Sequence, residues 1–543
     1  MYKTIFKTLV TLFVITIAFA VVIFCVRGSG GETAYVASDR PSAKAFVYDE
    51  SGELVETDLV RGTKVTAFTK KINGPEDIEL TKIEIGKETY YISEDQLSDK
   101  RKNVVTETTV YVRTPVTIYS EKDGPQIEGF APKKAELEVI GFDKLKQDGT
   151  VNKYKIRFED TEGYVYGKYL VYTEDEAAKN CNENGAYDMA KKAKFSYDLH
   201  GGSAKKLDYF PYERTKIEGN EFCKDARAMY LHAGAVMDDN YFELARKSGA
   251  NAVVINLDGG TLAYKSPVAK EMSPRAYKKA AHSLESYQEA VKKYNDAGFY
   301  TIGRIVCFND KNYAKDHPKE CIKTGGHTTD WVSAYSRNCW EYKVSLAREA
   351  VELMGFNEIQ FDYVRFPEES YTMSTTKGTD FRNKYHEEKA QATQNFCFYA
   401  ADQIHESGAY FSVDIFGESS NGYVPAYGQY WPAISNIVDA ISAMPYTDHH
   451  GDIDTWTKPY DFMNRWAKRC TKMQKHLPTP AVPRTWITGY NTPYWNPTVN
   501  YDYKMLKEQV RAMEDAGLKG GFIPWNATCD YGKYKEYKKI WAK

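Results

Sequence analysis

The chain has 543 residues, which at about 150 residues per domain predicts two to four structural units. Its 72 basic and 74 acidic side chains leave a formal net charge of only −2. No global field would therefore draw the chain to nucleic acid or to an acidic surface, and we expect no nucleic-acid partner.

The N-terminal segment predicts a membrane anchor. After Lys3 and Lys7, residues 8–26 are uncharged and mostly apolar, and a helix of that length roughly matches a bilayer core. A cleaved signal peptide is the alternative, but its apolar region usually ends in small residues, whereas this one ends in Ile-Phe-Cys-Val. We therefore predict an uncleaved, single-pass signal anchor at residues 1–27, which places the remainder outside the cell membrane.

The cysteines do not indicate a zinc site. Leaving aside Cys25, eight of the nine cysteines lie on the exported side, an even number that is compatible with disulfides of unspecified connectivity. Free buried thiols are the alternative. No Cys-x-x-Cys pair occurs, so we predict no structural zinc, no other metal site and no cofactor.

Short strand-like segments with turn signals predict small β modules after the anchor. The predicted strands are residues 45–48, 64–68, 81–85, 89–92, 110–113, 117–119, 136–140, 153–158 and 163–166. We place one module at 28–107, a second at 108–175 and a connector at 176–226, with a polar helix over residues 174–193.

The second module resembles the bacterial SH3-like modules of wall-associated proteins. The resemblance rests on Tyr111 and its neighbours, on Thr117-Ile118-Tyr119 and on Gly163-Tyr164-Val165-Tyr166, and the first module shows it less clearly. It implies binding to a cell-wall polymer, with simple spacing from the membrane as the alternative.

From residue 227 onward, apolar strands alternate with helices. The predicted strands are 228–231, 252–257, 300–308, 358–362, 410–416, 440–444, 482–487 and 521–525, and the predicted helices are 241–248, 282–297, 342–354, 387–407, 428–436, 460–476 and 503–516. This alternation predicts an α/β fold, a closed (β/α)8 TIM barrel over residues 227–543. A doubly wound open sheet is the alternative, but no Gly-x-Gly-x-x-Gly loop opens a helix.

Acids gather at the carboxyl ends of these strands, where the active sites of barrels form. Asp362 ends the fourth strand, while Asp414 lies in the fifth and Glu418 follows it. Strand parity lets neighbouring strands aim Asp362 and Asp414 into the mouth. Two facing carboxylates suggest glycosidic cleavage, in which one group protonates the leaving oxygen and the other attacks the anomeric carbon or activates water. A purely structural ion pair of Asp362 with Arg304 or Arg365 is the alternative.

Other polar and aromatic residues at the strand ends are candidates for substrate binding. His449 and the adjacent His450 suit loop hydrogen bonding better than metal binding, and Trp525 and Tyr446 suit either sugar stacking or rim packing. Asp330, Trp331 and Trp340 are predicted to lie in a long loop that shapes the cleft. The full set of candidate binding residues is Asp258, Arg304, Tyr363, Arg365, Tyr446, His449, Tyr490, Trp525 and Asn526.

Four segments together carry a specific resemblance: Phe361-Asp-Tyr-Val-Arg-Phe-Pro367, Arg304-Ile-Val-Cys-Phe308, Phe411-Ser-Val-Asp-Ile-Phe-Gly417 and Met444-Pro-Tyr446. On these, residues 227–543 resemble a glycosyl hydrolase family of bacterial barrels that is distantly similar to alpha-amylase-type hydrolases. The resemblance implies carbohydrate cleavage, with Asp362 in the position of the strand-four nucleophile. The usual Arg-x-Asp pattern is here Gln360-x-Asp362, so the supporting arginine must come from elsewhere.

The sequence therefore predicts a membrane-anchored extracellular glycoside hydrolase that cleaves a cell-wall or extracellular polysaccharide. Asp362 is the expected nucleophile or base, and Asp414 or Glu418 is the expected proton donor. The alternative is a non-catalytic carbohydrate-binding or wall-tethering protein built on a barrel scaffold.

Overall fold

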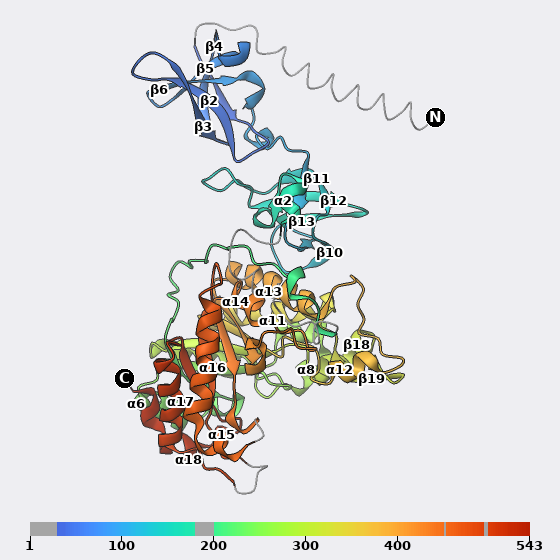
Figure 1. Ribbon diagram of the computed structural model, residues 1–543, viewed down its shortest axis with the longest axis vertical. Helices are drawn as coiled ribbons and strands as arrows, with labels where there is room; N and C mark the ends of the chain where they lie inside the picture. Colours follow the sequence, from blue (N-terminus) through green and yellow to red (C-terminus); the bar gives the residue numbers. More distant parts are fainter. Residues whose placement is uncertain (1–29, 180–189, 191–199, 450–451, 493–497, 543) are drawn as a thin grey trace. The chain divides into compact units, whose positions relative to one another are not determined.

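The computed structural model describes residues 30–179, 190, 200–449, 452–492 and 498–542 (Figure 1). These form two compact units, one built from residues up to 114 together with 131–177, and the other from residues 115–130 together with those from 178 onward. The predicted anchor at residues 1–27 lies outside the described residues. Among the helices of the described ranges, none is both long enough and apolar enough to cross a bilayer.

The first unit begins with an antiparallel seven-stranded sheet. Its spatial order is β3-β2-β6-β5-β4-β1-β7, and alternate side chains such as Ala45, Ile83 and Ile92 fill its core. The strands are β1 (Glu32–Val36), β2 (Ser42–Tyr48), β3 (Leu54–Val60), β4 (Lys64–Asn73), β5 (Glu79–Ile85), β6 (Glu88–Ser93) and β7 (Leu97–Ser98).

A second antiparallel sheet follows in the same unit. β12 pairs with both β11 and β13, while β8 pairs with both β11 and β14. The strands are β8 (Thr109–Val112), β11 (Glu136–Phe142), β12 (Lys153–Phe158), β13 (Thr161–Tyr166) and β14 (Leu170–Val171). The predicted all-β region is thus present, although the sequence did not predict β1, β3 or the short strands β7, β10 (Ile127–Ala131) and β14.

A buried ion pair connects the two sheets of the first unit. Arg61 Nη1 lies 2.7 Å from Glu107 Oε2, and both side chains are almost completely buried. The hydroxyl of Tyr154 also donates to Glu107, and Arg61 Nε donates to the carbonyl oxygen of Gly149 at 3.0 Å. Because Arg61 follows β3 and Tyr154 lies in β12, these contacts join the two sheets.

The second unit contains a closed, parallel eight-stranded barrel, as the sequence predicts. Neighbouring strands pair in the order β15-β16-β17-β20-β21-β22-β23-β24. Four of these strands, β20, β21, β22 and β24, have the predicted bounds. The strands are β15 (Ala226–Leu231), β16 (Ala252–Asp258), β17 (Tyr300–Val306), β20 (Glu358–Asp362), β21 (Tyr410–Phe416), β22 (Ala440–Met444), β23 (Val482–Thr488) and β24 (Gly521–Trp525).

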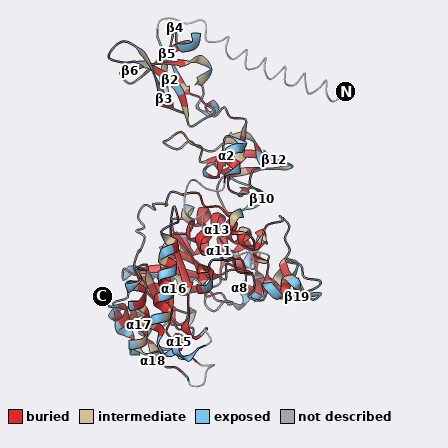
Figure 2. Ribbon diagram, viewed as in Figure 1, coloured by how far each residue is buried: buried red, intermediate tan, exposed pale blue. Residues whose placement is uncertain are grey.

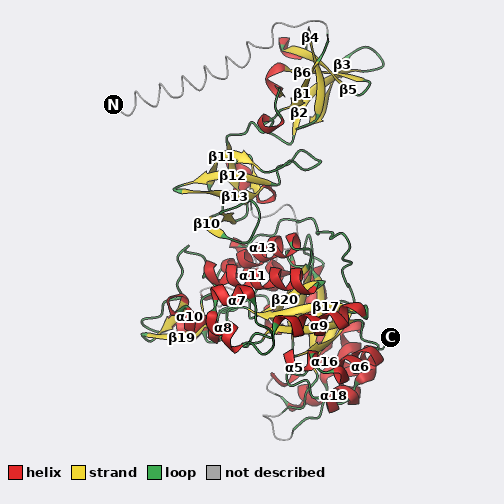
Figure 3. Cartoon of the chain, turned by 180° about the vertical axis from the view of Figure 1, so that it is seen from behind, coloured by secondary structure: helices red, strands yellow, loops and turns green. Residues whose placement is uncertain are grey.

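Helices surround the barrel strands (Figure 3). The main ones are α6 (Asp239–Ser248), α9 (Leu284–Asp296), α11 (Arg337–Met354), α13 (Lys389–Glu406), α14 (Trp431–Ser435), α16 (Pro459–Gln474) and α17 (Tyr503–Asp515). Shorter helices are α5 (Ala233–Val236), α7 (Pro267–Met272), α8 (Pro274–Lys279), α10 (Lys311–Asp316), α12 (Ser370–Thr375), α15 (Ile453–Thr457) and α18 (Tyr531–Glu536). Gly249 follows α6 with φ +83°, a left-handed cap that favours glycine.

Two local predictions were wrong. The long loop expected after the third strand is a hairpin of β18 (Cys321–Thr324) and β19 (His327–Val332) packed beside α10, with Gly325 and Gly326 both at positive φ in its turn. Trp340 does not shape a cleft, because it lies in α11 and is fully buried, with its indole N–H donated to the carbonyl oxygen of Ala334. The polar helix expected over residues 174–193 is described only as α2 (Glu174–Ala178), since most of the rest lies outside the described residues.

Burial is nearly complete along the barrel strands (Figure 2). Polar pairs also occupy the barrel interior, where Arg484 on β23 binds Glu358 on β20 at 2.6 Å with neither side chain exposed. The seven described cysteines are free thiols, and all but Cys223 are buried. Cys25 and Cys181 lie outside the described residues.

Candidate active site at the barrel mouth

Asp362 ends β20 and is held at both carboxylate oxygens. Arg304 on β17 donates from Nη2 to Oδ2 of Asp362, and the backbone N–H of Tyr363 donates to Oδ1 at 2.6 Å. Tyr363 has φ +54°, an uncommon left-handed conformation for a residue with a side chain. The chain thus turns sharply after the strand and directs its own amide back onto the carboxylate.

Arg304 supplies the arginine support that the sequence of β20 lacks. Its Nη1 donates to Asn256 Oδ1 at 2.7 Å, so β16 and β17 together orient the guanidinium towards Asp362. Burial acts to lower the pKa of Arg304, but Asp362, Tyr230 and Asp414 together outweigh it and the net pKa is raised. Gln360, which stands where an arginine was expected, instead donates to Ser442 Oγ at 3.0 Å.

Asp414 lies beside this pair but has no exposed surface. Its Oδ1 accepts a hydrogen bond from Trp486 Nε1 at 2.7 Å, and its Oδ2 lies 3.6 Å from Arg304 Nε. Burial and the nearby Asp362 carboxylate raise the pKa of Asp414 well above its ordinary range. The structure therefore brings the two predicted acids to one guanidinium, but it leaves Asp414 without access to a substrate.

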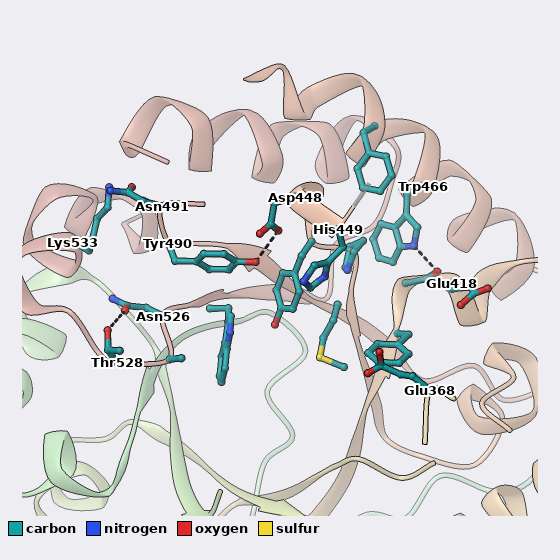
Figure 4. A pocket seen from close by; sticks show the side chains of 18 of the residues that line it. Glu368, Glu418, Asp448, His449, Trp466, Tyr490, Asn491, Asn526, Thr528 and Lys533 are labelled. Atoms are coloured by element: carbon teal, nitrogen blue, oxygen red, sulfur yellow. Dashed lines mark hydrogen bonds between the residues drawn. The ribbon is translucent and has the colours of Figure 1, made fainter. Parts of the chain in front are cut away.

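A cavity of about 1390 Å³ opens over the carboxyl ends of β21 to β24 (Figure 4). Asn491 and Lys533 lie at one end, and Glu368 and Glu418 at the other. Six of the predicted site residues line it, namely Glu418, Tyr446, His449, Tyr490, Trp525 and Asn526. Its aromatic lining consists of Phe416, Tyr446, Phe462, Trp466, Tyr490 and Trp525.

Two aromatic residues of the cavity wall, Trp525 and Tyr446, interact with the pair of Arg304 and Asp362. The guanidinium carbon of Arg304 lies 5.6 Å from the centre of the Trp525 ring. Burial raises the pKa of Tyr446 well above its ordinary range, with added contributions from Tyr490 and Asp362. The charge of Asp362 therefore acts on Tyr446 in the cavity wall. The Asp362 side chain is 7% exposed.

Glu418 is the predicted acid that reaches the cavity. It is exposed, and it accepts hydrogen bonds from the hydroxyls of Tyr423 at 2.6 Å and Tyr427 at 3.0 Å. Glu368 shares its end of the cavity (Figure 4), but its carboxylate is paired with Arg365 at 3.0 Å. Asp448 lines the cavity between the ends and accepts a hydrogen bond from Tyr490 at 2.7 Å (Figure 4).

Four predicted binding residues do not line the cavity, namely Asp258, Arg304, Tyr363 and Arg365. Asp258 is buried and paired with Lys343 of α11 at 2.7 Å. Because Lys343 also binds Asp310 at 2.6 Å, the lysine joins the ends of β16 and β17 to α11. Arg365 is buried between the rings of Trp331, Tyr363 and Phe416, and its expected contact with Asp362 is replaced by Glu368.

The expected histidine pair is only partly described. His449 is exposed in the cavity, with its ring centre 5.4 Å from that of Tyr446, while His450 lies outside the described residues. Within the ranges that the structure describes, no group of three or more acidic, histidine or cysteine side chains is placed to hold a metal ion.

Sequence reasoning missed several residues of the site. Phe462, Trp466 and Arg469 reach the cavity from α16, and no strand-end pattern marks a helix of this kind. Trp486 lies inside β23 rather than at its end, although its parity with Arg484 and Thr488 could have indicated that it faces the barrel interior.

Comparisons with solved structures give neighbours of low similarity. The glycoside hydrolase domain of PgaB (BpsB) from Bordetella bronchiseptica is 9% identical, with 58% of this chain and 99% of that chain covered and a TM-score of 0.43. A GH18 chitinase from Pseudoalteromonas aurantia is 11% identical over 58% and 97% of the two chains, with a TM-score of 0.35. A hypothetical protein from Ruminiclostridium thermocellum is 28% identical over 34% and 96%, with a TM-score of 0.29.

A search of curated proteins found no match. The family model described as "Putative glycosyl hydrolase domain" matches residues 228–531, which is more than half of the chain and spans the barrel from β15 into α18. The chain therefore belongs to this glycosyl hydrolase domain family.

Proposed function

We propose that the protein is a glycoside hydrolase that cleaves a cell-wall or extracellular polysaccharide at the mouth of its barrel. The observation that carries the proposal is Asp362, a carboxylate fixed at a strand end by Arg304, whose guanidinium carbon lies 5.6 Å from the centre of the Trp525 ring in the wall of a large cavity. A volume of about 1390 Å³ exceeds the usual range of small-molecule pockets, which suits an oligosaccharide segment. Membership of the glycosyl hydrolase domain family supports the same chemistry.

In this proposal the three predicted acids have different tasks. Asp362 is the nucleophile or base, because both of its oxygens accept hydrogen bonds, as the oxygens of an ionised carboxylate do. Glu418 is the proton donor, because it is exposed in the cavity and two tyrosine hydroxyls hold it. Asp414 is a positioning residue whose Oδ2 lies 3.6 Å from Arg304 Nε, rather than the proton donor, because it is fully buried.

A polysaccharide screen with mass detection of the released products tests the hydrolase. Asp362→Asn should lower product formation by at least about 10³-fold, since the amide can neither attack nor accept the proton. Asp454→Asn, which alters an exposed acid of α15 that does not line the cavity, is the matched control and should retain activity. Full retention of every activity in Asp362→Asn would overturn the proposal.

The second candidate is a carbohydrate-binding protein without hydrolytic activity. It is favoured by the low exposure of Asp362, which does not itself line the cavity, whereas six aromatic side chains do. In that case polysaccharide binds without product release, Asp362→Asn leaves the affinity unchanged, and Trp525→Ala or Tyr446→Ala weakens it. Loss of product together with retained binding in Asp362→Asn would favour the hydrolase instead.

The cellular setting belongs to the same proposal. We place the barrel outside the cell, held by a membrane anchor at residues 1–27, and we assign the β modules to wall-polymer binding or to spacing. The uncharged apolar run at residues 8–26 supports the anchor. Detection of the Met1–Arg27 peptide in protein recovered from the membrane fraction tests it, and a mature N-terminus after residue 27 would contradict it.

A further inference from the structure

A second cavity lies beside the first turn of α13, within the barrel unit. It has a volume of about 570 Å³ and contains Lys389, the first residue of that helix, whose residue surface is only 6% exposed. The residues that line it with Lys389 include His200, Ser374, Thr376, Thr379, Phe381 and Asn383.

The amine of Lys389 is held at this wall by neutral groups. Its Nζ lies 2.6 Å from the carbonyl oxygen of His200 and 2.9 Å from Ser374 Oγ, and it faces the Phe381 ring at 4.3 Å from the centroid. His200, Ser374 and Phe381 all line the cavity, so the reactive end of the lysine lies at its wall.

The nearby acids are bound to other partners. Glu388 binds Lys206 and also accepts from the backbone N–H of Ser203 at 2.6 Å, while Asp380 is paired with Arg382 at 2.5 Å. Among the described residues, no carboxylate forms an ion pair with Lys389. The other titratable groups that line the cavity are Tyr335 and His200.

A buried ammonium without a counter-ion is unfavourable, so the amine gives up its proton readily. Burial lowers the pKa of Lys389 from 10.5 to about 8. Its place in the first turn of an 18-residue helix acts in the same direction, because the positive end of the helix dipole lies there. A larger fraction of this lysine than of a surface lysine is therefore an uncharged nucleophile near neutral pH.

We propose that Lys389 is a carbonyl-reactive amine, which captures a hydroxylated aldehyde or ketone in this cavity as an imine. The amine nitrogen attacks the carbonyl carbon, and the carbonyl oxygen leaves as water with the two hydrogens of the amine. Ser374 Oγ accepts from the Lys389 amine and so fixes its position at the wall, and the polar groups of Thr376, Thr379 and Asn383 suit the hydroxyls of an open-chain sugar. This proposal is independent of the hydrolase assignment.

Reductive trapping on the native full-length protein tests the proposal. Glyceraldehyde and sodium cyanoborohydride are added near pH 7.5, and adducts are located by peptide mass mapping. Lys292, an exposed lysine paired with Asp296, is an internal control. Because the pKa of Lys389 is lowered to about 8, its uncharged fraction at this pH is about 200-fold larger than that of an amine with the ordinary lysine pKa. We therefore expect at least about tenfold faster labelling at Lys389 than at Lys292 after allowance for the burial of Lys389.

Two further readings decide the outcome. Labelling of Lys389 should level off above about pH 8, where its amine is already largely uncharged. Glyceraldehyde should label Lys389 faster than propanal does, with similar rates for both reagents at Lys292. Labelling of Lys389 no faster than that of Lys292 would overturn the reactive amine, and equal rates with the two aldehydes would overturn the hydroxylated class of ligand.

Discussion

Arg304 Nε and Asp414 Oδ2 face each other at 3.6 Å in the barrel interior, and neither atom has a hydrogen-bond partner among the described residues. The same guanidinium donates to Asp362, so it is shared unequally between the two acids. The buried Asp414 carboxyl therefore lies beside a guanidinium whose hydrogen bond goes to Asp362.

Asp414→Asn should change how stability depends on pH. Because the folded-state pKa of Asp414 is raised, its stabilising contribution is complete below about pH 4 and is lost as the pH rises through the folded value. The asparagine cannot titrate but can still accept from Trp486. We therefore expect the stability of Asp414→Asn relative to wild type to increase from pH 4 to pH 7 in urea denaturation.

The control for that measurement is Asp454→Asn, whose carboxylate is exposed and paired with Lys458. Its stability relative to wild type should vary little over the same range. A flat difference between Asp414→Asn and wild type would show that Asp414 is ionised throughout.

Glu418→Gln should lower kcat by about 10²- to 10⁴-fold on natural glycosides, because the leaving oxygen then receives no proton. An activated aryl glycoside needs no such proton, so its hydrolysis should be largely retained. Glu368→Gln is the matched control, since its carboxylate lies at the same end of the cavity but is paired with Arg365. The opposite pattern, with loss in Glu368→Gln and not in Glu418→Gln, would move the proton donor to Glu368.

Glu107→Gln should destabilise the β unit by about 3–5 kcal/mol, because it leaves the buried charge of Arg61 without its partner. Thermal and urea unfolding of the full chain should show this as an earlier transition. Glu138→Gln breaks an exposed pair with Arg157, and it should cost at most about 1 kcal/mol. Equal effects of the two substitutions would contradict a structural role for the buried pair.

Lys389→Met should remove a pH-dependent part of the stability. The folded pKa of Lys389, about 8, lies below that of the unfolded chain, so the unfolded state binds more protons between about pH 8 and pH 10.5. Wild-type stability therefore gains up to about 3 kcal/mol from this group as the pH rises through that window. Relative to Lys389→Met, wild type should gain stability between these pH values, whereas Lys292→Met should follow wild type.

Much of the barrel was predictable because its signals are local. Each strand is a short apolar run before or after a helix, and β20, β21, β22 and β24 have the predicted bounds. The hairpin of β18 and β19 was missed because two short strands around a Gly-Gly turn look like a loop in an otherwise alternating pattern. β1 and β3 were missed for a similar reason, since their polar residues interrupt the expected alternation.

The site was less predictable, because partner choice depends on distances between strands. The sequence placed Asp362, Asp414 and Arg304 at neighbouring strand ends and named Arg304 and Arg365 as possible partners. Only the packing selected Arg304, since Arg365 is enclosed by the rings of Trp331, Tyr363 and Phe416. The helix α16 brings Trp466 into the cavity from about 100 residues beyond β20, a relationship that no local pattern contains.

The sequence by itself determined the eight-stranded barrel and the position of Asp362 at a strand end, because periodicity and chain order are properties of neighbouring residues. The tertiary structure decided which acid meets the cavity. Asp414 and Glu418 are four residues apart. Asp414 is fully buried and accepts from Trp486, whereas Glu418 is exposed and accepts from Tyr423 and Tyr427. Burial depends on what the rest of the barrel packs against each side chain, and that is set only when distant segments meet.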